Sequence, residues 1–215
     1  MKLRSVVGLA SVALVLSACS NGPSYNGLAA IVDGQTISTQ SISDQVSQAR
    51  TDIQALPAAD VQTVPSIQML GAMAVHRIVL NKVLDKALAE QGITISDTDV
   101  TAFEQSIFAQ YGKESVVAQL MTNNGVPASE IHNFFRTVLI ENVLEKKLDP
   151  TGDQTSQTKA LVQYLGQVSD KLGIEISPRF GKWDNATLQP TGSDDVLSTL
   201  NDAAQFAQAQ AQQTQ

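Results

Sequence analysis

Cys19 carries the most distinctive reactive group, because it is the only cysteine in the 215-residue chain. It follows Leu16, Ser17 and Ala18, the order of a bacterial lipobox: an aliphatic residue, two small residues and the cysteine. In such a motif a thioether to diacylglycerol removes a thiol that would otherwise meet an oxidising compartment. The pattern therefore predicts a lipid attached to Cys19. The alternative is an ordinary signal peptide that is cleaved after Ala18.

The residues before the lipobox have the pattern of a secretory signal. Lys2 and Arg4 form a basic start, and the apolar stretch 6–16 is too short for a stable membrane-spanning helix. We therefore expect residues 1–18 to be a lipoprotein signal peptide and residues 19–27 to be a lipid tether. Two or more acyl chains anchor a protein stably. The expected location is thus the extracytoplasmic face of the bacterial cell membrane.

The charge balance narrows the classes of partner. The chain has 14 basic and 21 acidic residues, a formal net charge of −7, and removal of residues 1–18 would make it −9. An acidic protein is not attracted to nucleic acid or to anionic lipid headgroups. Membrane attachment would therefore depend on the covalent lipid. With 43% hydrophobic residues, the chain can still bury a core, and its length fits one domain or at most two.

Residue types that carry catalysis are present but not grouped. His76 and His132 each fall inside a predicted helix, without a second metal ligand at a suitable spacing. No serine lies in a G-x-S-x-G elbow, and no phosphate-binding glycine loop occurs. The carboxylates are scattered along the helices. We therefore expect no catalytic residue, no metal, no cofactor and no enzymatic activity.

Methionine and aromatic side chains are the remaining candidates for a binding site. In a helical domain they usually belong to the core. The alternative is an open groove, in which flexible methionines adapt to varied apolar partners. The candidate groove residues are Met69, Met73, Phe103, Phe108 and Tyr111.

Hydrophobic spacing and capping signals predict a series of helices. Their expected ranges are 41–56, 65–91, 96–111, a short helix ending at 123–125, 126–148 and 159–172. The second has no charged residue between Ser66 and Val75, and its apolar residues occupy more than one stripe. Such a helix is either covered on several sides or open to a ligand on one of them.

The stretch Leu28–Ser38 predicts two short strands joined by a turn at Asp33-Gly34. A two-stranded ribbon alone is only marginally stable, so it needs a partner. We expect that partner to be a strand over residues 174–183, with Phe180 or Trp183 in the core. The two ends of the fold would then meet.

The order of these elements resembles the N-terminal chaperone module of the SurA/PrsA family of extracytoplasmic foldases. One signature is an opening strand with an Asn-Gly-like turn, an isoleucine and a polar helix start, which Ile31–Ser38 matches. The other is a helix, a glycine-hydrophobic-small loop and a long basic and aliphatic helix, which 120–148 matches. The resemblance covers residues 28–183.

The resemblance implies a mainly α fold: a helical SurA-N/trigger-factor-like module closed by a small β-ribbon of N- and C-terminal strands. We expect this domain at 28–184 and a Gln/Ala-rich, flexible tail at 185–215. Many members insert a parvulin-type prolyl isomerase between the last two helices, but here that junction is only 149–158.

The function implied is therefore a non-enzymatic holdase or foldase for unfolded exported polypeptides, without nucleic acid as a partner. Two alternatives stay open. One is an interaction or scaffold lipoprotein that serves a dedicated partner in envelope assembly. The other is a peptidyl-prolyl isomerase, which the short junction disfavours.

Overall fold

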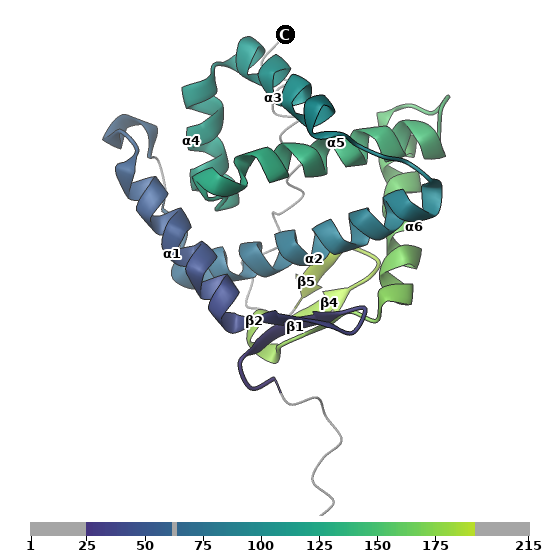
Figure 1. The fold of residues 1–215 in the computed structure, drawn as a ribbon, viewed down its shortest axis with the longest axis horizontal. Coiled ribbons are helices and arrows are strands. Elements are labelled where there is room, and N and C mark those ends of the chain that lie inside the picture. Colours follow the sequence, from purple (N-terminus) through teal and green to yellow (C-terminus); the bar gives the residue numbers. More distant parts are fainter. Residues whose placement is uncertain (1–24, 62–63, 192–215) are drawn as a thin grey trace, which may run out of the picture.

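The computed structural model of the chain describes residues 25–61 and 64–191. In these residues the protein is mainly helical, with six α-helices and five short strands. Figure 1 shows α2 (Ile67–Gln91) in the middle, with the strands on one side and α5 (Ile131–Leu148) on the other. The predicted mainly α fold with small antiparallel strands is confirmed.

The first sheet joins the two ends of the described chain. β1 (Leu28–Val32) lies between β2 (Gln35–Ser38) and β3 (Glu175–Ile176) and is antiparallel to both. Within this sheet, Ile31 of β1 is the register partner of Glu175 in β3. An N-terminal strand and a C-terminal strand therefore do form one ribbon, with β1 at its centre.

The turn between β1 and β2 follows from two residues. Asp33 and Gly34 have positive φ angles of 52° and 72°, the pair that a tight hairpin turn requires. β2 leads directly into α1 (Thr39–Ala55), where the Ser38 hydroxyl accepts a hydrogen bond from the Ser41 amide at 3.1 Å. α1 therefore begins two residues before the expected range 41–56, because β2 holds Ser38 in the extended conformation that a cap residue needs.

The C-terminal end of the fold differs from the single strand expected over 174–183. Only β3 pairs with β1, and Pro178–Phe180 forms a 3₁₀ turn, η3. Proline favours the first position of such a turn and has no N–H for a strand ladder. β4 (Lys182–Asp184) pairs instead with β5 (Gln189–Thr191) in a second sheet. Both aromatic residues of this segment are buried, as expected.

The fold also continues beyond the boundary expected at residue 184. Leu188 is buried in the core, and β5 pairs with β4, so the first part of the expected tail 185–215 belongs to the domain. Residues 185–191 are mostly polar, and Leu188 is the one large apolar residue among them, which is why their composition concealed the second strand. The rest of the tail (192–215) and the signal peptide with Cys19 lie outside the described residues.

α2 is covered on several sides along most of its length. It contacts α1, α5, α6 (Gln154–Leu172), β1, β5 and η3. The helix begins after its N-cap Ser66, two residues later than the expected range 65–91. It ends at Gly92, whose φ of 62° is the left-handed conformation that glycine favours. Of the two expected alternatives, a helix covered on several sides is therefore the one observed, except at the N-terminal end of α2.

Two hydrophobic clusters stabilise the domain. The larger lies between the strands, α1, α2, α6 and the second half of α5. The smaller joins α3 (Asp97–Tyr111), α4 (Lys113–Asn124) and the first half of α5, with Phe135 fully buried in it. Short 3₁₀ turns, η1 (Ala58–Asp60) and η2 (Ala128–Glu130), connect the helices.

Candidate functional site

A groove of about 510 Å³, lined by both apolar and polar side chains, lies between α1, the start of α2 and η3. On each helix the lining residues include pairs that are three or four positions apart, which lie on the same face of the helix. The lining residues are Thr39, Ile42, Ser43, Val46, Ile67, Gln68, Gly71, Ala72, Arg179 and Phe180.

The floor of the groove consists of buried apolar side chains. Ile42 is 3% exposed and Phe180 is 8% exposed, so both already belong to the main core. Gly71 contributes no side chain, and a Cβ at this position would lie 3.4 Å from Phe180 Cε1. The glycine thus keeps the hollow open without creating strain in the helix.

One wall of the groove is an exposed aliphatic side chain. Ile67 is 60% exposed, and the nearby Val64, outside the lining, is 56% exposed. These two are the exposed large hydrophobic residues in ranges 25–61 and 64–191. A single exposed apolar residue is ordinary on a protein surface. Ile67 differs because it extends a concave apolar surface that is already formed.

The rim of the groove carries one charged residue. Arg179 lines it from η3, and its guanidinium carbon lies 4.9 Å from the centroid of the Phe180 ring. Cation–π contact of this kind holds a flexible arginine over the aromatic face. The groove therefore combines an apolar floor with a cationic edge.

The two predicted groove methionines lie in the packed part of α2. Met73 is only 5% exposed. A Cβ on Gly125 would lie 2.9 Å from Met73 Sδ and 2.6 Å from Leu70 Cδ2, so the α4–α5 connection covers this part of α2. Met69 is partly buried against the main core. Neither methionine lines the groove.

The three predicted aromatic residues lie on α3 and are partly buried against the smaller cluster. Phe103 and Phe108 both contact Phe135 edge to face, with ring centroids 6.1 and 5.4 Å apart. The structure thus brings these two predicted residues together around one buried ring. Tyr111 ends the same helix, and none of the three lines the α1–α2 groove.

Sequence analysis missed Ile67, Gly71 and Arg179 as groove residues. Gly71 provided one usable signal, since a glycine within a helix costs up to about 1 kcal/mol relative to alanine. The exposure of Ile67 and the position of Arg179 depend on how η3 folds back onto α2. No local pattern reports that contact.

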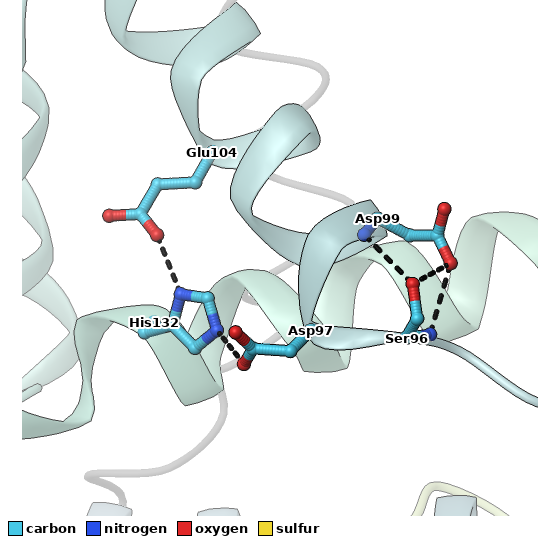
Figure 2. A network of polar contacts seen from close by, with 5 residues as sticks. All are labelled: Ser96, Asp97, Asp99, Glu104 and His132. Atoms are coloured by element: carbon cyan, nitrogen blue, oxygen red, sulfur yellow. Dashed lines mark hydrogen bonds and ion pairs between the residues drawn. The ribbon is translucent and has the colours of Figure 1, made fainter.

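A polar cluster fastens α3 to α5 elsewhere in the domain. Figure 2 shows His132 between two carboxylates of α3: Nδ1 lies 2.8 Å from Glu104 and Nε2 lies 3.0 Å from Asp97. Beside it, Ser96 and Asp99 form a reciprocal capping box at the start of α3. The hydrogen bond to Glu104 is the main reason that the pKa of His132 is raised.

This cluster does not have the geometry of a metal site. The two carboxylates lie against opposite nitrogens of one imidazole, so they do not converge on a common point. Within the described ranges, no group of three or more His, Cys, Asp or Glu residues could hold a metal ion.

The other histidine is part of the core. His76 is buried, its Nε2 lies 3.1 Å from the Leu188 carbonyl oxygen, and its ring stacks on Trp183. Burial lowers the pKa of His76 to about 4, so the ring is neutral near pH 7. It donates to the carbonyl and has a structural role.

Comparison with known proteins decides the family. A family model described as the SurA-like N-terminal domain matches residues 2–125, more than half of the chain. The chain belongs to the SurA-like N-terminal domain family. No curated protein and no solved structure matches it. The match ends at Gly125, so it contains the α1 and α2 walls of the groove, whereas η3 lies beyond it.

Membership relates this SurA-like protein to a chaperone family whose domains act outside the cytoplasm and bind unfolded polypeptides. α5 and α6 are joined by residues 149–153 alone, so no isomerase domain is inserted between them. Across the part of the chain that the structure describes, no helix is long and apolar enough to cross a bilayer.

Proposed function

We propose that this SurA-like protein is a membrane-anchored, non-enzymatic chaperone that holds unfolded exported polypeptides in the α1–α2–η3 groove. The supporting observation is the combination of a preformed apolar floor and the exposed Ile67 in a domain of a chaperone family. A preformed concave apolar surface binds apolar segments without reading their sequence closely.

The size of the groove suits weak, reversible binding. Burial of apolar surface contributes about 25 cal/mol per Å², and a client segment loses conformational freedom when it is held. A groove of about 510 Å³ accommodates only a few side chains at once. The expected complex is therefore short-lived, which allows a client to be released for folding.

The decisive experiment compares two exposed residues. Purified protein should suppress the aggregation of a chemically unfolded substrate, and Ile67→Ser should remove most of that suppression. Val64→Ser is the matched control, because Val64 is exposed to a similar extent but does not line the groove. Equal loss in both variants, or no suppression by excess wild-type protein beside an active control chaperone, would contradict the proposal.

The α3 face formed by Phe103, Phe108 and Tyr111 is kept as a second client contact. These side chains are partly buried, so part of their surface is still available. Tyr111→Ser should then weaken capture of long clients more than capture of short peptides, because only a long chain reaches both surfaces. Equal effects on both client lengths would argue against this second contact.

The anchoring part of the proposal concerns Cys19. The lipobox spacing supports a thioether-linked lipid on this residue after removal of residues 1–18. Wild-type protein expressed in a bacterium should enter the detergent phase on phase separation, whereas Cys19→Ser should stay in the aqueous phase. Mass spectrometry of the N-terminal peptide should show the added diacylglyceryl group. An unmodified peptide beginning at Cys19 would favour ordinary signal cleavage.

The two alternative functions, a dedicated scaffold and a prolyl isomerase, predict different experimental results. For the dedicated scaffold, crosslinking in cells would recover one partner in constant proportion instead of many exported chains. For the isomerase, a proline-isomerisation assay would show a rate above buffer. We expect many clients and no rate enhancement, with a parvulin enzyme as the positive control.

A further inference from the structure

We infer that the groove selects client segments in which a large apolar residue stands next to an acidic residue, and that Arg179 binds the carboxylate. This inference rests on the proposed chaperone function and specifies the chemistry of its client. The juxtaposition that carries it is a guanidinium held at the edge of an apolar floor.

Arg179 is positioned but not neutralised. Its guanidinium lies over the Phe180 ring, yet no carboxylate among residues 25–61 and 64–191 forms an ion pair with it. Arg136, in contrast, binds Asp85 at 2.7 Å. Arg179 is exposed, so its donors are accessible to an incoming chain.

The guanidinium suits a carboxylate in particular. Its planar set of N–H donors matches the two oxygens of a carboxylate, and charge-assisted hydrogen bonds of this type are stronger than neutral ones. Contact with Phe180 already restricts the side chain, so less conformational entropy is lost on binding. The adjacent apolar surface lowers the local dielectric, which strengthens the pairing.

The charge of the whole protein makes this position distinctive. The chain carries a formal net charge of −7, so an acidic client segment is repelled by much of its surface. The groove lining contains Arg179 as its one charged residue and no aspartate or glutamate. Complementary charge at the groove therefore sets the register of a bound segment and disfavours a lysine in the same place.

The test uses three labelled peptides that differ at one position. Each has a leucine pair followed by Asp, Asn or Lys, and both ends are capped so that the only carboxylate is the aspartate. Fluorescence anisotropy with the full chain should give a dissociation constant about threefold lower for Asp than for Asn, as an exposed ion pair predicts. The Lys peptide should bind most weakly, and the Asp preference should shrink at 1 M salt.

Variants of Arg179 test whether its charge causes the peptide preference, independently of any effect on folding. Arg179→Gln should bind the Asp and Asn peptides equally, and Arg179→Lys should keep part of the preference without the fork geometry. Lys182→Gln is the control, since this exposed cation of β4 lines a different depression and should leave the preference unchanged. Circular dichroism at matched concentration checks that each variant is folded.

The outcomes distinguish the two proposals. Equal binding of all three peptides to wild-type protein overturns the role of Arg179 but leaves the chaperone function intact. If none of the peptides binds, the groove is not the client site and both proposals fail.

Discussion

The imidazole of His76 stacks on the indole of Trp183, with ring centroids 6.0 Å apart and planes inclined by 28°. This pair joins the middle of α2 to β4. The indole N–H donates to the Ser169 hydroxyl at 2.7 Å, and His76 donates to the Leu188 carbonyl. The C-terminal hairpin is therefore attached to the central helix by aromatic stacking and buried hydrogen bonds.

The first prediction is acid destabilisation through His76. Its folded pKa, about 4, lies below the ordinary value of 6.5, so the unfolded chain takes up the proton first as pH falls. Stability from neutral His76 is present above about pH 6.5 and decreases towards pH 4. We expect a loss of about 2 kcal/mol in the free energy of unfolding between pH 7 and pH 5.

Denaturant titrations at the two pH values check this loss. His76→Phe keeps an aromatic ring but cannot titrate, so its stability should depend less on pH than that of the wild type. It should also be less stable at pH 7, because the Leu188 carbonyl then lacks its donor. An unchanged pH slope would show that another group is responsible.

The second prediction has the opposite sign and concerns His132. Its pKa is raised by Glu104 and Asp97, so its contribution is complete below the unfolded value near 6.5 and disappears as pH rises through the folded pKa. Because the side chain is 41% exposed, we expect an effect below about 1 kcal/mol. The stability difference between wild type and His132→Gln should fall between pH 6 and pH 9. Glu104→Gln should reduce the contribution of His132 to stability more than Asp97→Asn does.

The third prediction compares two glycines in helices. Gly71→Ala places a Cβ 3.4 Å from Phe180, an ordinary contact, and should raise the free energy of unfolding by about 0.5–1 kcal/mol through helix propensity. The same change should weaken peptide binding, because it narrows the groove. Gly166→Ala is the counterpart and should be destabilising, since its Cβ would lie 2.7 Å from the Asn185 carbonyl oxygen. Thermal melts and anisotropy on both variants test the pair.

The fourth prediction concerns the joined ends of the fold. A chain that ends at Gly173 lacks β3, Phe180 and Trp183, and therefore leaves one edge of β1 and one side of α2 uncovered. We expect a lower helical signal and a broad, weakly cooperative melt. A truncated protein that melts like the full chain would show that the C-terminal segment is dispensable for folding.

Local signals in the sequence predicted most of the helical fold. Glycines 92, 112, 125 and 173 end the helices where expected, because each signal depends on the backbone of a single residue. The hairpin turn at Asp33-Gly34 was found for the same reason. The η3 turn and the β4–β5 hairpin were not, since Leu188 and Pro190 show no repeating apolar pattern.

The candidate site was harder to predict than the fold. Met73 is of a residue type that is typical of adaptable grooves. Whether its side chain is exposed depends on the α4–α5 connection, which approaches it through Gly125. Arg179 and Ile67 meet at one groove although they are far apart in the chain. Such positions are determined by long-range packing, and a single sequence carries no direct signal for it.

The central position of β1 has a consequence for synthesis from the N-terminus. β2 is made within a few residues of β1, but β3 pairs with its other edge only after about 140 further residues have been added. Until then the oldest strand presents an unpaired edge, which is a site for pairing with other chains. A protein proposed to hold unfolded exported polypeptides thus passes, during its own synthesis, through a stage that is open to unwanted strand pairing.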